Sequence, residues 1–171
     1  MPRYQQSRDG FVHIYTDGAC SRNGAPDAKA GIGVFFADGS PLNVSEPVVG
    51  RATNNTAEIQ AVTRAAEVAC EEGINKILIH TDSAFVMNCI NKWMDRWKRR
   101  DWITTSGRKV VNKGDLLDME QALKNFGAVK WKHVPGHGDS YGNRRADELA
   151  REGARRYQPP HYFCGLAMLN Y

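Results

Sequence analysis

The sequence predicts an α/β fold in which a mixed sheet is flanked by helices. Three stretches with strand character come first along the chain, and helical and strand patterns then alternate, which is the order typical of such folds. The chain has 171 residues, of which 42% are hydrophobic and 25% are charged. This length and composition suit one globular domain with a buried core rather than a disordered chain.

The first part of the chain predicts a β-meander. Residues 1–9 are polar and are expected to form a flexible lead. Residues 11–16 alternate between apolar and polar side chains, as a strand with one buried face does. Residues 30–37 form the second expected strand, and a turn-forming Asp-Gly-Ser sequence leads into a third at residues 42–48.

Helices and strands alternate in the remainder of the chain. A helix is expected at residues 57–70, where apolar residues such as Ile59 and Val62 recur at helical spacing. The elements expected after it are, in order, a strand at 76–81, a helix at 83–93, a helix at 115–126, a strand at 128–134, a glycine-rich loop at 135–142 and a helix at 143–156. The domain is therefore expected to span residues 10–156, with a tail at residues 157–171 outside the fold.

Four acidic residues are candidates for a common site. Asp17 and Asp82 each end an expected strand and follow a threonine. If these strands lie parallel and adjacent, both aspartates project from the carboxyl edge of the sheet, where open α/β folds place their ligands. Glu58 and Asp147 lie in helices expected to border that edge. Each residue also has a local explanation as a turn residue, helix cap or first-turn acid, but these explanations do not account for the shared edge.

A cluster of four carboxylates predicts a metal site. Without cations, the negative charges would repel one another and raise the pKa values of the group. Ligands that are all oxygen, with no clustered Cys or His, favour Mg²⁺ or Mn²⁺ over zinc. Two such ions about 4 Å apart can activate a water and stabilise the leaving oxygen of a phosphoryl displacement. The chemistry that the cluster favours is therefore phosphodiester hydrolysis.

The positive charge of the chain is concentrated in one segment. Residues 92–113 carry a net charge of +6, whereas the whole chain carries +4. Such a segment predicts a polyanionic partner, although a solvated charged surface would have the same composition.

The four cysteines form no C-x-x-C pair, and the sequence has neither a secretory signal nor the run of ~20 apolar residues that spans a bilayer. An intracellular, reduced protein is expected.

Four motifs follow one another at characteristic spacings. They are Tyr15-Thr16-Asp17-Gly18-Ala19-Cys20, Thr53-Asn54-Asn55-Thr56-Ala57-Glu58, Thr81-Asp82-Ser83, and Val134-Pro135-Gly136-His137-Gly138 followed by Gly142-Asn143 and Ala146-Asp147. In this order they resemble type 1 ribonuclease H, and the resemblance runs from about residue 11 to residue 156. It implies a ribonuclease H-like mixed five-stranded sheet flanked by helices. It also implies an endonuclease that hydrolyses the RNA strand of RNA–DNA hybrids and leaves 5′-phosphate and 3′-hydroxyl ends.

The resemblance implies roles for the acidic residues and for one histidine. Asp17, Glu58, Asp82 and Asp147 would bind two Mg²⁺ ions per active site, and Mn²⁺ could substitute. His137, which stands between two glycines, would assist protonation of the leaving group or release of product and metal. A near-neutral pKa suits such proton transfer. A purely structural loop histidine is the alternative.

The resemblance also implies three groups of residues that bind the hybrid. They are Cys20, Asn23, Asn54 and Asn55 for the RNA minor groove; Arg51, Thr53 and Asn112 for a phosphate of the DNA strand; and Trp93, Trp97 and Thr105 for a channel that holds deoxyribose. An enzyme that cuts only RNA must detect the 2′-hydroxyl, which amides can do, and a guanidinium suits a phosphate. The alternative is structural: turn and cap roles for the asparagines and a core stripe for the two tryptophans, of which Trp93 is expected to be at least partly buried.

The chain departs from the family in two ways. Arg144-Arg145 stands where the family usually has at least one acidic residue, which bears on the charge around Asp147. The chain also has no room for the small hybrid-binding module that eukaryotic members often carry, so an isolated catalytic domain or a form without that module is expected.

Other functions stay open at this point. They are a retroelement-derived ribonuclease H domain, a catalytically weak hybrid-binding module with the same fold, and an integrase-like or resolvase-like nuclease. The expected partner is an RNA–DNA hybrid duplex, bound by a monomer that does not associate with membranes. The expected location is the nucleus or mitochondrion of a eukaryote, or otherwise the cytoplasm.

Overall fold

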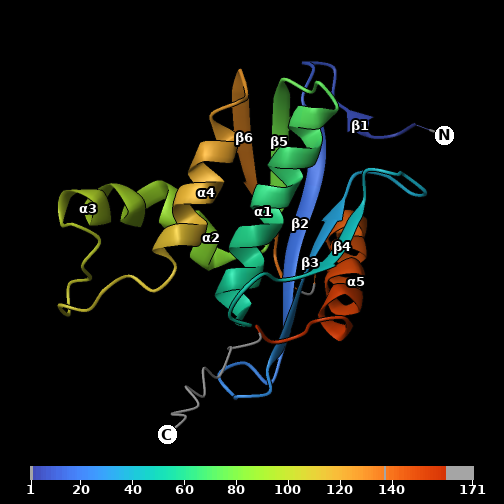
Figure 1. Ribbon diagram of the computed structural model, residues 1–171. Helices are drawn as coiled ribbons and strands as arrows, with labels where there is room; N and C mark the ends of the chain where they lie inside the picture. The colour runs from blue at the N-terminus through green and yellow to red at the C-terminus, as the bar shows by residue number, and fades with distance from the viewer. Residues whose placement is uncertain (1, 137, 161–171) are drawn as a thin grey trace, which may run out of the picture.

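The computed structural model describes residues 2–136 and 138–160. A mixed sheet with the strand order β4-β3-β2-β5-β6 forms the centre of the molecule, and the short β1 pairs with the start of β2 (Figure 1). The strands are β1 (Gln5–Gln6), β2 (Val12–Ser21), β3 (Lys29–Phe35), β4 (Val44–Pro47), β5 (Lys76–Thr81) and β6 (Ala128–His133). The predicted α/β class and mixed sheet are confirmed.

Helices cover both faces of the sheet. They are α1 (Asn54–Glu71), α2 (Ala84–Asn88), a π-helical turn (Cys89–Trp93), α3 (Met94–Arg99), α4 (Lys113–Leu123) and α5 (Tyr141–Arg155). Helix α1 packs on β2 and β3 and against α4, whereas α5 packs on β2, β3 and β4 from the other side (Figure 1).

Alternation along β3 separates the two helical layers. Ile32 and Val34 belong to the hydrophobic core that includes α1, and Gly31 and Gly33 face α5. A Cβ atom on Gly33 would lie 2.0 Å from the backbone oxygen of Ala146 in α5. Because only glycine permits this approach, β3 lets α5 pack directly on the sheet.

Strand β2 is longer than its sequence pattern predicts. The expected end was residue 16, but the strand continues to Ser21. Its parallel pairing with β5 stops at Tyr15 and His80, while its antiparallel pairing with β3 continues to Ser21 and Lys29. Asp17 therefore lies within a strand and not after its end, because a second partner strand extends the ladder.

At particular residues near the two chain ends, the structure shows order and packing that the sequence did not predict. In the segment 1–9, Gln5 and Gln6 form a strand that pairs with β2, so this part of the expected lead is ordered. In the segment 157–171, Tyr157 is only 7% exposed and belongs to the hydrophobic core. The pairing of Gln5 and Gln6 is with nearby residues, Val12 and His13, whereas Tyr157 reaches back 107 residues to Gly50, a contact that local composition does not reveal.

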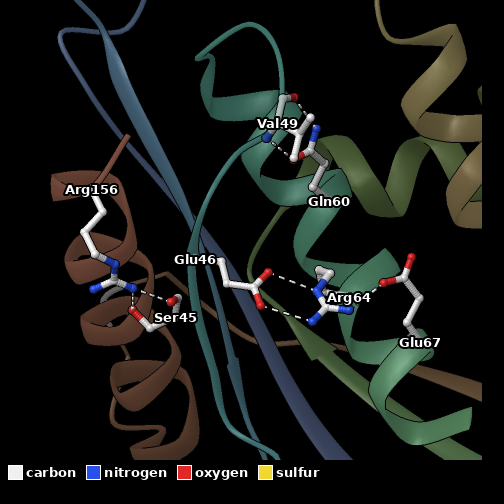
Figure 2. Close-up of polar contacts among 7 residues, drawn as sticks. All are labelled: Ser45, Glu46, Val49, Gln60, Arg64, Glu67 and Arg156. Carbon is white, nitrogen blue, oxygen red and sulfur yellow. Dashed lines mark hydrogen bonds and ion pairs between the residues drawn. The ribbon is translucent and has the colours of Figure 1, made fainter. Parts of the chain in front are cut away.

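Side chains from both helical layers hold the edge strand β4 (Figure 2). Arg64 of α1 donates one hydrogen bond to each carboxylate oxygen of Glu46, both at 3.0 Å. On the other side, Arg156 donates to Ser45, and the Ser45 hydroxyl donates to the backbone oxygen of Leu149 at 2.7 Å. Strand β4 is therefore fixed to α1 and to α5 through its own polar side chains.

The helix expected at residues 83–93 continues to Arg99 by way of the π-helical turn. Ser83 caps its start by accepting a hydrogen bond from the backbone N–H of Val86.

Over the residues that the structure describes, no helix combines the length and the apolar character that crossing a membrane requires.

Candidate active site

Three carboxylate groups meet at one edge of the sheet. Asp17 lies in β2, Asp82 directly follows β5, and Glu58 lies in the first turns of α1. One oxygen atom of each carboxylate lies within 4.8 Å of the others. Because β2 and β5 are parallel neighbours, both aspartates emerge on the same side, as the sequence predicted.

Gly18 allows Glu58 to reach this edge. A Cβ atom at position 18 would lie 2.5 Å from the backbone nitrogen of Glu58 and 2.6 Å from the carbonyl carbon of Ala57. The absence of a side chain thus brings the start of α1 against β2, immediately beside Asp17. The backbone N–H of Gly18 also donates a hydrogen bond of 2.9 Å to Asp17 Oδ1.

The site opposes the ionisation of its own carboxyl groups. Burial raises the pKa of Asp17 to about 8, and the negative charges of Asp82 and Asp147 add to this effect. Burial also raises the pKa of Glu58 well above its usual value, with further contributions from Asp17 and Asp82. Glu58 Oε2 is buried and has no hydrogen-bond partner among the described residues. A bound cation would offset the repulsion between the carboxylates and would favour their ionised forms.

Asp147 approaches the cluster from the opposite helical layer. It lies in α5, and its charge contributes to the raised pKa of Asp17, although it is not one of the three groups within 4.8 Å. Its Oδ2 forms an ion pair of 3.0 Å with Arg151 Nε. The four predicted carboxylates are thus brought to one region, with three in close contact and the fourth held by an arginine.

The carboxylates do not act as helix caps. Thr53 caps α1, Ser83 caps α2 and Ser140 caps α5, each by accepting a backbone hydrogen bond through its hydroxyl group. The capping roles considered for Asp82 and Asn55 are therefore wrong, because neighbouring hydroxyls take those positions. The carboxylates are left available for another function.

Asn143 belongs to the site, although no role was predicted for it beyond its place in the fourth motif. Its Nδ2 donates a hydrogen bond of 3.3 Å to Asp82 Oδ2, and the residue is only 6% exposed. Asn143 precedes Asp147 by one turn of α5, so it ties the carboxylate after β5 to the helix that carries the fourth acid. The Gly142-Asn143 pair in the motif was the available signal.

The three asparagines lie beside the carboxylates and are exposed. The backbone N–H of Asn54 donates a hydrogen bond of 3.1 Å to Asn23 Oδ1, so the loop after β2 contacts the start of α1. Asn55 is adjacent in the same helix. Cys20, in β2, lines an open cavity of about 570 Å³ together with Asp147 and Arg151. The residues predicted to contact RNA thus lie on the elements that carry the carboxylates or in the loop after β2.

Thr53 and Asn112 come together through Thr56, a residue that the sequence did not single out. Thr56 is buried, and its hydroxyl accepts hydrogen bonds from Thr53 Oγ1 at 2.8 Å and from Asn112 Nδ2 at 3.2 Å. Arg51 is exposed and precedes Thr53 by two residues. Thr56 therefore joins the start of α1 to the start of α4 beneath the candidate phosphate pocket. Its position in the second motif was a signal for proximity but not for this role.

The two predicted tryptophans form part of a longer aromatic row. The ring centroids of Trp93 and Trp97 are 5.7 Å apart, and the row continues to Phe85 at 5.8 Å and to Trp102 at 6.2 Å. Trp93 and Trp97 are partly buried, as expected for Trp93, and pack against the core. Thr105 is exposed in the loop after Trp102. The aromatic row packs the basic segment against the hydrophobic core.

His137 lies outside the described residues, so the structure gives it no position. Its neighbours Gly136 and Gly138 are described, and a Cβ atom on Gly136 would lie 3.8 Å from Asp82 Oδ2. Gly136, the residue before His137, therefore lies close to Asp82.

Comparisons with known proteins agree with these features. The family model for RNase H matches residues 9–155. The chain is 46% identical to human ribonuclease H1 over 146 residues, which cover 85% of this chain and 51% of that protein. It is 39% identical to ribonuclease H of Cyanothece sp. over 85% of this chain and 90% of that protein. The chain thus spans about half the length of the mammalian relatives that it matches and nearly the whole length of the cyanobacterial one.

Solved structures show the same fold. RNase H1 of the archaeon Halobacterium salinarum has a TM-score of 0.59 at 31% identity, covering 86% of this chain and all of that one. LC9-RNase H1, described as a type 1 RNase H with the type 2 active-site motif, has a TM-score of 0.65 at 26% identity, covering 85% of this chain and 72% of that one.

Proposed function

Because the chain belongs to the type 1 ribonuclease H family, we propose that it is an endonuclease that hydrolyses the RNA strand of RNA–DNA hybrids. The products would carry 5′-phosphate and 3′-hydroxyl ends. The observation that supports this activity most strongly is the convergence of Asp17, Glu58 and Asp82 within 4.8 Å. A hybrid-binding module without activity would need no such cluster of buried, mutually repelling acids.

Ribonucleases H depend on divalent metal ions, and the residues of this chain fit such ions. All the donors are oxygen atoms, and Glu58 Oε2 is buried without a partner among the described residues. Asp17, Glu58, Asp82 and Asp147 would hold two Mg²⁺ ions, and Mn²⁺ would substitute. When bound, the ions lower the pKa of water and neutralise charge that develops on the phosphoryl oxygens.

The contributions of the protein itself follow from the positions of its side chains. Gly18 and Asn143 fix the relative positions of the carboxylates, the first by close packing and the second by its hydrogen bond to Asp82. His137 would protonate the leaving group or assist release of product and metal. The proximity of Gly136 to Asp82 supports this role.

Recognition of RNA would use the exposed groups around Asp17 and Glu58. Asn23, Asn54 and Asn55 offer amide donors and acceptors to 2′-hydroxyl groups, and Cys20 would lie along the same minor groove. This proposal is supported by the exposure of the three asparagines and by the contact between Asn23 and Asn54 at the start of α1.

Recognition of DNA would use two separate surfaces. Arg51, Thr53 and Asn112 would bind one phosphate, since Thr56 links the two polar side chains of this set. Trp93 and Trp97 would pack on deoxyribose, with Thr105 and the basic side chains of residues 92–113 following the phosphates.

The monomeric state, the intracellular location and the domain bounds stay predictions from the sequence.

The activity is tested with RNA–DNA, RNA–RNA and DNA–DNA duplexes of one sequence, each incubated with Mg²⁺ or with chelator and analysed on denaturing gels. Cleavage of the RNA strand of the hybrid alone, and only with Mg²⁺, is the expected result. Cleavage of either homoduplex at a comparable rate would contradict the proposed substrate.

The metal ligands are tested with Asp82→Asn. This substitution should abolish cleavage because it removes a negatively charged ligand, while hybrid binding in a filter or anisotropy assay persists. Asp118→Asn, an exposed acid of α4, serves as the control and should retain activity. Near-normal turnover of Asp82→Asn would contradict the ligand assignment.

A further inference from the structure

The loop between β4 and α1 is held at three consecutive residues. The backbone N–H of Val48 donates to Ala30 O at 3.0 Å. Val49 is bound by the side chain of Gln60, and Gly50 is bound by the side chain of Tyr157. Arg51 follows at once, so the last residues before it have little freedom to move.

The Gln60 side chain uses its amide fully. Its Oε1 accepts from the N–H of Val49 at 2.9 Å, and its Nε2 donates to the carbonyl oxygen of Val49 at 2.8 Å (Figure 2). This pairing imitates the contacts that a neighbouring strand would make. The second proton of Nε2 is donated to Asp115 Oδ1 at 3.1 Å.

The contact with Asp115 extends the connection to the other wall of the phosphate pocket. Asp115 lies in the first turn of α4, and Asn112 immediately precedes the first residue of the same helix. Gln60 therefore links the loop that carries Arg51 to the helix that presents Asn112. It does so from a position in α1, one turn after Thr56.

Tyr157 holds the loop from the opposite side. It is 7% exposed, and its hydroxyl donates a hydrogen bond of 2.7 Å to the carbonyl oxygen of Gly50. Gly50 has a φ of +87°, a conformation that glycine adopts readily. Tyr157 also lines one cavity of about 510 Å³ together with Arg51 and Thr53.

We propose that Gln60 and Tyr157 are positioning residues that hold Arg51 in register with Thr53 and Asn112 for a phosphate of the DNA strand. This inference rests on the proposed function. Neither side chain needs to touch the phosphate. By fixing the loop before substrate arrives, they reduce the conformational entropy that binding would otherwise cost.

The proposal is tested by combining two subtle substitutions with a change in the substrate. Gln60→Met and Tyr157→Phe remove the hydrogen bonds and retain side-chain volume. Hybrids are prepared with a single neutral methylphosphonate at successive positions of the DNA strand. With the wild-type protein, one position should raise KM by about tenfold, as expected for the loss of one charge-assisted contact.

The double variant should have a KM for the unmodified hybrid that is higher by about tenfold and a kcat within about twofold of wild type. Neutralising the sensitive phosphate should then raise its KM by less than about threefold, since the contact is already weakened. Arg51→Ala provides the reference for complete loss. The matched controls are Gln121→Met and Tyr141→Phe, which change exposed residues of α4 and α5.

The outcomes separate this inference from the proposed function. If the wild-type protein cleaves no hybrid, the function itself is wrong. If it cleaves the hybrid but the double variant keeps the full tenfold penalty, or if no position is sensitive in the wild type, the positioning role is overturned. A purely structural role would lower thermal stability without changing the penalty at one phosphate.

Discussion

The carboxyl group of Asp17 is buried among other acids, and this environment couples function to stability. Its pKa is about 8 in the folded protein and close to 4 in an unfolded chain. A folded-state pKa that is raised in this way contributes stability below about pH 4, and the contribution is lost as the pH rises through 8. In the metal-free protein, the buried Asp17 carboxyl should therefore lower the free energy of unfolding at neutral and alkaline pH.

Replacing Asp17 with Asn should reveal that penalty. In chelator at pH 8, Asp17→Asn should increase the free energy of unfolding by about 2–4 kcal/mol, and the increase should be smaller at pH 5. Urea denaturation at both pH values measures the effect, with Asp118→Asn as the exposed control. An equal increase at the two pH values would contradict the account, and cleavage activity should be lost in either case.

His80 has the opposite dependence on pH. It is 4% exposed, its Nε2 lies 2.9 Å from Nδ1 of His13, and its ring stacks on the ring of Tyr15. Burial, followed by the charges of His13 and Lys132, lowers the pKa of His80 to about 4. Because the folded-state pKa is depressed, stability is present above about pH 6.5 and is lost as the pH falls through 4.

The substitution His80→Gln should flatten this loss of stability between pH 6.5 and pH 4. The expected difference is on the order of 2 kcal/mol across the interval, followed by urea midpoints at half-unit steps. His133→Gln, which changes an exposed histidine, is the control for the general effect of acid. If both variants lose stability as steeply as the wild type, His80 is not the group responsible.

At the scale of elements, the close contact between β2 and α1 sets the geometry of the site. Gly18→Ala would place a Cβ atom 2.5 Å from the backbone nitrogen of Glu58, so α1 would have to move away. Activity should fall by more than about tenfold, since an error of about 1 Å in a catalytic group has consequences of that size or larger.

The control for this substitution is Gly114→Ala. Gly114 lies in α4, where a Cβ atom would meet nothing within 4 Å, so alanine should raise stability by about 0.5–1 kcal/mol and leave kcat unchanged. Thermal melts and single-turnover rates distinguish the two variants. A Gly18→Ala protein with normal rates would show that α1 can yield without disturbing Glu58.

Elements whose boundaries depend on local signals were predicted well, and those that depend on partners were not. Strand β5 begins and ends where its apolar run does, at Lys76 and Thr81. The end of β2 was missed because pairing with β3 extends it to Ser21. The helix that begins at Ala84 was predicted to end at residue 93, but it continues to Arg99 through a π-helical turn that no residue pattern marks.

At the scale of the whole molecule, the basic segment extends beyond the sheet. Helix α3 lies away from the strands (Figure 1), and Arg99 and Arg100 at its end are exposed. Substituting both with Gln should weaken hybrid binding and reduce the slope of log K against log salt concentration by about 1–2, since each phosphate contact releases roughly one counterion.

The salt dependence is measured by anisotropy titrations from low to physiological ionic strength. Arg3→Gln with Arg8→Gln, which removes the same charge from exposed residues near the N-terminus, is the control. An unchanged slope for the Arg99 and Arg100 variant would mean that these side chains face only solvent.

The sequence was sufficient to predict the acidic cluster because its members lie in motifs of fixed order. It was not sufficient to predict the contacts that hold the cluster and its surroundings in place. The hydrogen bond between Asn143 and Asp82 spans 61 residues, that between Asn112 and Thr56 spans 56, and Tyr157 reaches back 107 residues to Gly50. Such pairings depend on the folded arrangement of elements and leave no local pattern.

The short edge strand β4 also bears on how the protein behaves at high concentration. Exposed strand edges are templates on which other chains can add strands and aggregate. Strand β4 spans only Val44–Pro47, and the last residue has no backbone N–H to donate. The ion pair of Glu46 with Arg64 places charge beside the same edge (Figure 2). This side of the sheet is therefore a poor template for pairing with strands of other molecules.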